Sequence, residues 1–107
     1  FDGGYDIIYK DKKADIKSMN RTVDPKPFYI NNVFDVQLKH PSEVYIFTSL
    51  NTKKKNLSIC GWVSKDDFKK RASFYPKGTV RMRGPEPFPL RADNWEIKNE
   101  DLNEFSK

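Results

Sequence analysis

The sequence has little of what several classes of protein depend on. It holds one cysteine, Cys60, and one histidine, His40, among 107 residues. A single cysteine excludes an intrachain disulfide, and the two residues together are too few for a structural zinc cluster or a histidine-based nuclease site. No apolar run approaches the ~20 residues of a membrane span, and no charged-then-apolar start indicates a signal peptide. We therefore expect an intracellular, cytoplasmic protein.

The bulk composition is that of a folded, mildly basic domain. Aromatic residues make up 14% of the chain, which argues against a disordered polypeptide. Twenty Lys and Arg residues against 15 Asp and Glu give a formal net charge of +5, a balance that suits a polyanionic partner such as nucleic acid. At this length we expect one domain that spans residues 1–107.

The order of apolar and turn-forming residues predicts an α+β fold, with a mixed, mostly antiparallel central sheet flanked by helices. Strands are predicted at residues 5–9, 14–19, 28–30, 43–50, 57–63 and 94–97. Helical segments are predicted at 33–38, at 65–74 after Ser64 as the N-cap, and at 99–102. A long basic loop rich in Gly and Pro is expected at 75–91.

The first predicted hairpin carries Asp6, Asp15 and Lys17 within its strands. If Asp11 and Lys12 form the tight turn, Asp6 lies opposite Lys17 and shares a face with it and with Asp15, because side chains alternate along a strand. One interpretation is a solvated cross-strand ion pair of little energetic value. The other is a Mg²⁺ site, in which the two carboxylates supply hard oxygen ligands and the lysine positions the attacking water.

The stretch YDIIYKDKKADIKSMN resembles the signature of the PD-(D/E)XK nuclease superfamily. In that signature an acid on one strand precedes an acid-x-lysine triplet on the next. Asp6 matches the first acid, Asp15 the second and Lys17 the lysine, and Tyr5 stands where the family commonly has proline. The later order of EVYIFTSLN, a polar turn, LSICGWVSKDDFKKRASF and ADNWEIKNEDL is similar to phage and restriction-associated members, so the resemblance covers residues 3–102.

The resemblance implies a restriction-endonuclease-like core and a metal-dependent nuclease, a phosphodiester hydrolase that prefers DNA to RNA. Its implied catalytic residues are Asp6, Asp15 and Lys17, and its implied Mg²⁺ ligands are Asp6, Asp15 and the carbonyl of Ile16, with Mn²⁺ able to substitute. Members usually have a helix before the first acid, whereas FDGG stands there in this chain. We expect that helix to be missing here and to come from a longer polypeptide, another protein or a homodimer partner. A phage-encoded form would act in the host cell.

Five residues are predicted to contact nucleic acid: Arg21, Gln37, Arg81, Arg83 and Arg91. Arg21 leaves the strand of the triplet, Gln37 ends a predicted helical segment, and the other three stand in the exposed loop. An ordinary surface position is the alternative for Gln37 and for the loop residues. Two other functions stay open: a catalytically inactive nucleic-acid-binding module of the same fold, and a phage-type protein-interaction module.

Overall fold

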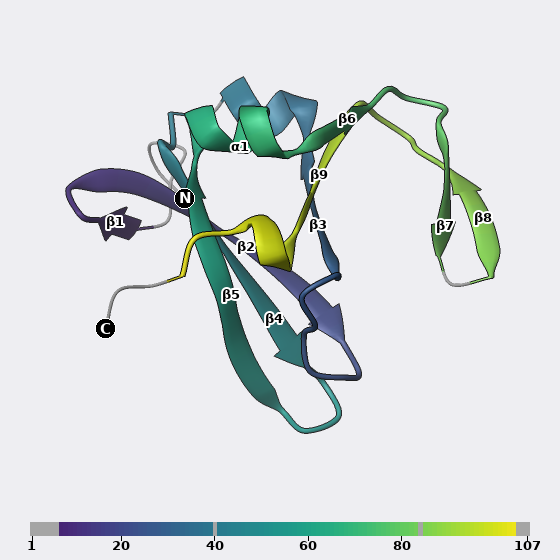
Figure 1. The fold of residues 1–107 in the computed structure, drawn as a ribbon, viewed down its shortest axis with the longest axis horizontal. Helices are drawn as coiled ribbons and strands as arrows, with labels where there is room; N and C mark the ends of the chain where they lie inside the picture. Colours follow the sequence, from purple (N-terminus) through teal and green to yellow (C-terminus); the bar gives the residue numbers. More distant parts are fainter. Residues whose placement is uncertain (1–6, 40, 84, 105–107) are drawn as a thin grey trace.

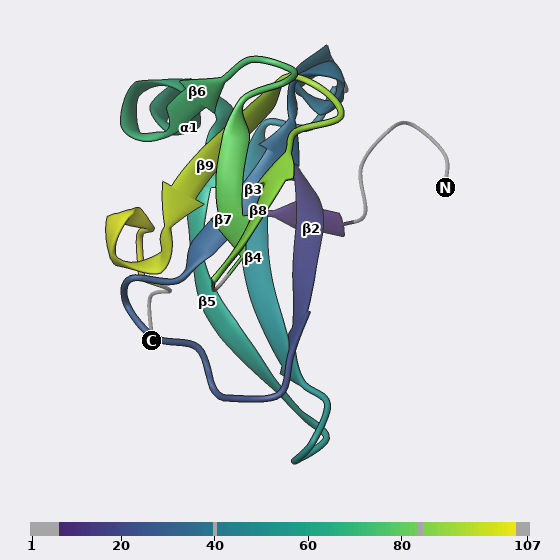
Figure 2. The ribbon, with the colours of Figure 1, turned by 90° about the vertical axis from the view of Figure 1, so that its right-hand side faces the viewer.

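The computed structural model describes residues 7–39, 41–83 and 85–104, apart from the side chain of Arg83, and these residues form an α+β domain (Figures 1 and 2). Sheet A contains, in spatial order, β1 (Ile7–Tyr9), β2 (Lys12–Arg21), β4 (Val44–Asn51) and β5 (Asn56–Ser64). Sheet B contains β3 (Ile30–Phe34), β9 (Asn94–Lys98) and β6 (Ser73–Tyr75). The other elements are the strand pair β7 (Val80–Arg83) and β8 (Glu86–Pro89), the helix α1 (Lys65–Arg71), and the 3-10 segments η1 (Asp35–Lys39) and η2 (Asn99–Asp101). The expected mixed, mostly antiparallel α+β architecture is confirmed.

The β1–β2 hairpin turns at Lys10 and Asp11, not at Asp11 and Lys12 as the sequence suggested. Both turn residues have positive φ, 49° and 63°, as the favoured two-residue hairpin turn requires. Ile7 therefore pairs with Ala14, two residues away from the expected register. A shift of two residues leaves every side chain on its own face of the sheet. Asp6 lies outside the described residues, so its predicted pairing stays a prediction.

Strand β4 is the centre of sheet A. It pairs in parallel with β2 and antiparallel with β5, and nearly all of its residues are buried, in keeping with the apolar run in the sequence. The face of sheet A that carries Tyr45 and Phe47, called here the inner face, packs around Phe68 of α1 in the main core. The opposite, outer face holds a smaller core built on Ala14, Val44 and Ile46.

Sheet B covers the inner face, where the sequence predicted flanking helices. Val33 and Ile97 of sheet B belong to the same buried core as Tyr45 and Phe47. The helical segment expected at 33–38 was wrong in its first half, because Val33 and Phe34 pair with β9 as strand residues. β-branched and aromatic side chains favour such a pleated, half-buried position. Only η1 is helical there, as a 3-10 segment.

Helix α1 starts where the sequence predicted. The Ser64 side chain accepts a hydrogen bond from the Asp67 backbone N–H at 3.2 Å, and Asp66 and Asp67 lie at the positive helix end. The helix ends at Arg71 rather than at residue 74, because the residues of β6 pair with β9. Within the described part of the chain, no helix has the length and hydrophobicity to cross a membrane.

Strands β7 and β8 form a two-stranded finger, where the sequence predicted an irregular basic loop (Figure 1). Val80 pairs with Pro89 and Arg83 with Glu86. The sequence did not predict β8 because this strand contains prolines. Proline has no backbone N–H to donate to a neighbouring strand, so within sheets it is confined to edge strands. Both strands of a two-stranded ribbon are edges, so the pairing tolerates them.

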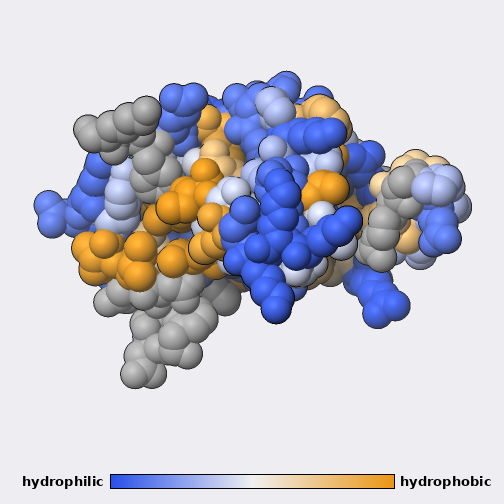
Figure 3. All heavy atoms as spheres, turned by 90° about the horizontal axis from the view of Figure 1, so that it is seen from below, coloured by the Kyte–Doolittle hydropathy of each residue, from blue (hydrophilic) through white to orange (hydrophobic). Residues whose placement is uncertain are grey.

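Apolar side chains remain exposed on the outer face of sheet A. Ile7, Ile16, Leu57 and Ile59 each keep more than a third of their surface accessible. Figure 3 shows apolar surface gathered at the end of the molecule where β1 lies, beside the polar tip of the β4–β5 hairpin.

Gly61 allows the chain near the C-terminus to approach β5. A Cβ placed on Gly61 would lie 2.7 Å from the Asn103 carbonyl oxygen and 2.8 Å from Leu102 Cβ, at a φ of +153°. The neighbouring Trp62 exchanges backbone hydrogen bonds with Asn103 in both directions. Glycine is thus required by contact as well as by conformation.

We expect Gly61→Ala to lower the free energy of unfolding by about 1–3 kcal/mol, the usual range for overpacking. The measurement is urea unfolding followed by circular dichroism. Gly78→Ala is the matched control, because Gly78 also has positive φ (+91°) but nothing lies within 4 Å of the added Cβ. Equal losses in both variants would contradict the close-approach explanation and leave only backbone strain.

Candidate active site and adjoining groove

One face of β2 carries the charged residues singled out from the sequence. Asp15, Lys17, Met19 and Arg21 alternate with outward-facing residues, so all four side chains lie on the inner face of sheet A. Their position is fixed by the parallel pairing with β4, in which Asp15 lies beside Tyr45 and Lys17 beside Phe47.

Asp15 and Lys17 form a buried ion pair. Lys17 Nζ lies 2.8 Å from Asp15 Oδ2, and the two side chains are only 16% and 5% exposed, respectively. Asp15 Oδ2 accepts no hydrogen bond of acceptable geometry from the described residues, so its contact with Lys17 is a charge pair rather than a directed bond. A carboxylate held in this way is costly to bury, and such groups concentrate at functional sites.

The surroundings of Asp15 are shaped by Tyr45. The ring of Tyr45 is fully buried, and Lys17 Nζ lies 5.9 Å from its centroid. Burial raises the pKa of the Tyr45 phenol, and the charge of Asp15 raises it further. The phenol therefore stays neutral near neutral pH, so it neither competes with Asp15 for the positive charge of Lys17 nor acts as a base there.

Lys65 was not among the residues predicted from the sequence, but its charge interacts with that of Asp15. Its Nζ donates to the Leu38 carbonyl at 2.9 Å. Burial lowers the pKa of the Lys65 ammonium and Lys69 lowers it further, while the Asp15 charge opposes both. Only the order of the strands could have indicated this position of Lys65. Lys65 follows β5 directly, and its backbone N–H donates to the carbonyl of Glu43, which precedes β4.

The predicted metal ligands are partly described. Asp15 presents a carboxylate oxygen that accepts no hydrogen bond within the described part of the chain, and Ile16 is the strand residue between Asp15 and Lys17. Carboxylate and carbonyl oxygens are the ligands that Mg²⁺ prefers, so these donors fit that ion in kind. Asp6, the second predicted carboxylate, lies outside the described residues. Among the residues that are described, no three His, Cys, Asp or Glu side chains gather as a metal site.

Two of the five predicted nucleic-acid contacts, Arg21 and Arg81, come together. They line one groove of about 370 Å³ between the end of β2, the segment entering β3, and the finger. Its apolar lining consists of Met19, Phe28, Tyr29, Ile30, Met82 and Phe88. Each arginine lies over a tyrosine ring: Arg21 over Tyr29 at 4.4 Å, and Arg81 over Tyr75 at 4.0 Å.

The other three predicted contacts lie elsewhere or are only partly described. Gln37 Oε1 accepts from the Phe34 backbone N–H at 3.1 Å, so its amide holds the entry to η1. Arg91 lines a separate hollow with Asp35 and Asp93. Arg83 ends β7, and its side chain is outside what the structure describes. Contacts of these residues with nucleic acid stay predictions.

Arg81 also fastens the finger to sheet B. Its Nε and Nη2 donate to the two carboxylate oxygens of Glu96 at 2.9 and 2.6 Å, a bidentate pair that raises the pKa of the guanidinium. The Glu96 side chain is only 9% exposed, so this pair is better shielded from solvent than an ordinary surface ion pair. The finger is thereby anchored on the groove side.

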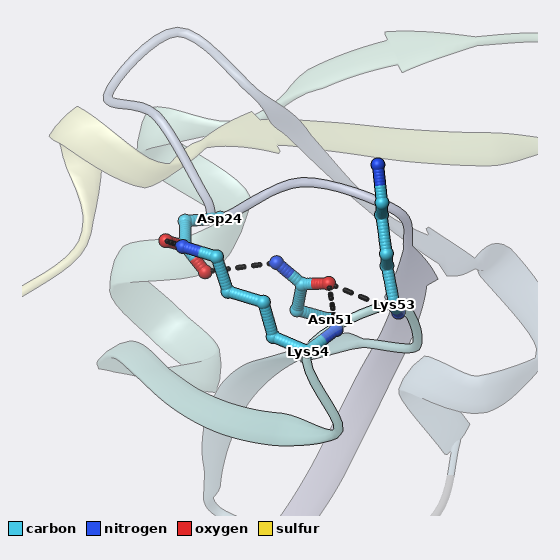
Figure 4. Close-up of polar contacts among 4 residues, drawn as sticks. All are labelled: Asp24, Asn51, Lys53 and Lys54. Carbon is cyan, nitrogen blue, oxygen red and sulfur yellow. Dashed lines mark hydrogen bonds and ion pairs between the residues drawn. The ribbon is translucent and has the colours of Figure 1, made fainter.

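A second tether holds the opposite wall of the groove (Figure 4). The buried Asn51 side chain donates to Asp24 Oδ1 at 3.0 Å and accepts from the backbone N–H groups of Lys53 and Lys54. Lys54 Nζ lies 3.0 Å from Asp24 Oδ2. The loop that connects Arg21 to Phe28 is therefore bound to the β4–β5 hairpin.

Comparison with protein-family models, with curated proteins and with solved structures gives no match. Function therefore has to be inferred from the residues and their geometry.

The Asp24 tether predicts a specific pH dependence. The hydrogen bond from Asn51, followed by that from Lys54, lowers the pKa of Asp24. A carboxylate with a lowered folded-state pKa stabilises the fold above its unfolded pKa of about 3.9 and loses that contribution as the pH falls through the folded-state value. We expect the Tm of wild type to exceed that of Asp24→Asn at neutral pH, and the gap to close in acid.

Thermal melts across this pH series measure the gap. Glu86→Gln is the control, because it removes an exposed carboxylate that lies on the finger and takes no part in the Asp24 tether. A Tm difference for Asp24→Asn that stays constant from neutral pH to below the unfolded pKa would contradict the charged tether.

Proposed function

We propose that this chain is a Mg²⁺-dependent nuclease domain that hydrolyses phosphodiester bonds of DNA at the Asp15–Lys17 pair. The observation that carries the proposal is this buried pair, with Nζ and Oδ2 2.8 Å apart on the inner face of sheet A. Support comes from the resemblance of the first hairpin to the PD-(D/E)XK signature, from the electrostatic interaction of Lys65 with Asp15, and from the net charge of +5.

The residues divide the chemistry as follows. Asp15, with Asp6 and the Ile16 carbonyl, would hold the metal through hard oxygen ligands. Bound Mg²⁺, or Mn²⁺ in its place, supplies Lewis acidity toward the phosphate and toward an attacking water. Lys17 orients that water and stabilises the negative charge that grows on the phosphate. Lys65 adds a second positive charge near the carboxylate.

Cleavage of plasmid and single-stranded DNA, with and without Mg²⁺, tests the proposal. We expect Asp15→Asn and Lys17→Met each to reduce the rate at least ~100-fold, as removal of a transition-state contact does. These near-isosteric changes are preferred to alanine, because removing one partner of a buried pair by truncation costs about 3–5 kcal/mol in stability. Circular dichroism melts confirm that each variant is folded.

Lys12→Met is the matched control, because Lys12 lies on β2 but is exposed and directed to the other face. Its cleavage rate should equal that of wild type. Wild-type activity in Asp15→Asn and Lys17→Met, or activity that persists in EDTA, would contradict the proposed nuclease.

A nucleic-acid-binding module without catalysis is the second candidate. It is favoured by the groove, whose arginine and aromatic lining does not include Asp15 or Lys17. This alternative predicts salt-dependent DNA binding that is unchanged in Asp15→Asn and no heat of Mg²⁺ binding in calorimetry. The nuclease predicts a heat of Mg²⁺ binding that Asp15→Asn abolishes.

A further inference from the structure

We infer that the substrate is a single strand of nucleic acid, which runs along β2 from the Asp15–Lys17 pair and inserts an unstacked base into the groove beside the finger. The inference deepens the proposed function and rests on it for cleavage, whereas base binding in the groove stands independently of catalysis.

The ion pair and two lining residues of the groove lie on the same face of one strand, β2. Lys17, Met19 and Arg21 share the inner face of β2 with Asp15, and Met19 and Arg21 line the groove. From Asp15 to Arg21 the strand rises about 20 Å, at ~3.3 Å per residue. A single strand of nucleic acid that runs along β2 would therefore reach the groove within a few nucleotides of the Asp15 carboxylate.

The groove is large enough for a single base but too small for a base pair within a duplex. Its volume of about 370 Å³ lies in the range of sites that hold one small organic ligand. A base pair within a duplex is stacked on both faces and carries a second backbone, so it cannot enter such a space. A base from a single strand can, because its ring is free to leave the stack.

The lining of the groove combines exposed apolar side chains with arginine. Phe28 is 59% exposed and Met82 is 61% exposed, so the groove offers apolar surface to an incoming ring. Arg21 uses one N–H group on the Ile30 carbonyl, at 3.1 Å, which leaves other donors of its guanidinium for a phosphate. Aromatic surfaces with arginine are the combination by which proteins hold single strands without reading their sequence.

The described lining of the groove is net positive, with Arg21 and Arg81 against Glu96. Glu96 is the groove's acidic residue, and both of its oxygens are taken by Arg81. Arg21 therefore faces a ligand without a competing carboxylate in the lining. A polyanion with planar rings satisfies both the positive charge and the apolar walls, whereas an acidic peptide would leave the aromatic surface unfilled.

Fluorescence anisotropy with a labelled oligothymidylate of about a dozen nucleotides tests the inference, in EDTA to prevent cleavage. We expect the single strand to bind more tightly than a duplex of equal length, and Phe28→Ala and Arg21→Gln each to weaken it about 5- to 100-fold, as loss of a stacked base does. Thymidine monophosphate should compete poorly, because a single nucleotide cannot also make the contacts along β2 that the longer strand makes.

Phe34→Ala and Lys70→Gln are the matched controls, since Phe34 is 47% exposed, Lys70 is exposed on α1, and both residues lie outside the groove. Their affinities should stay within about twofold of wild type. Met82→Ser provides a second exposed groove variant if Phe28→Ala melts early. Equal affinities in groove and control variants, or a preference for duplex, would overturn the inference.

Cleavage separates this inference from the proposed nuclease. Selective loss of binding in Phe28→Ala and Arg21→Gln, with no Mg²⁺-dependent cleavage in wild type, would uphold the binding groove and refute the nuclease. Duplex cleavage at the wild-type rate by both groove variants would uphold the nuclease and refute a single-stranded substrate.

Discussion

The parallel pairing of β2 with β4 is the constraint on which the site depends. It runs from Ala14 beside Val44 to Arg21 beside Asn51 without a shift of register. Because β4 is buried on both faces, its neighbour cannot slip by one residue without exchanging Ala14 for Asp15 on the outer-face core. The same pairing that fills the core therefore fixes the side chains of Asp15, Lys17 and Arg21 on the inner face. Chemistry and packing are specified by one register.

The Asp15–Lys17 ion pair on that face contributes little net stability, because burying two charges costs free energy that their attraction barely offsets. Taking two charges out of water carries several kcal/mol per ion, and apolar residues of similar volume commonly replace such a pair without loss. Asp15 is more completely buried than Lys17, and none of the residues that the structure describes donates a hydrogen bond of acceptable geometry to its Oδ2. Stability gives no reason to place a carboxylate there. A function that requires a dehydrated carboxylate beside an ammonium does.

Local chemistry determined which features could be predicted. The apolar run of β4 and the Ser64 cap depend on neighbouring residues, and both were found from the sequence. The shared face of Asp15 and Lys17 was also correct, since it depends only on alternation and not on the turn position. Features set by distant pairing were missed: β3 exists because β9 supplies its partners, and the finger pairs despite its prolines. Lys65 was missed because its electrostatic interaction with Asp15 depends on the pairing of β2, β4 and β5, which the local sequence does not reveal.

The two walls of the groove are held by contacts that involve no ligand. Arg81 is fixed to Glu96, and the loop after Arg21 is fixed through Asp24 to Asn51. Side chains already ordered in the free protein lose little conformational entropy on binding, so more of the contact energy appears as affinity. Each tether lies beside an arginine that itself rests on a tyrosine ring. The arrangement places two planar cations at fixed positions around apolar surface, which is a geometry suited to a ring attached to a phosphate.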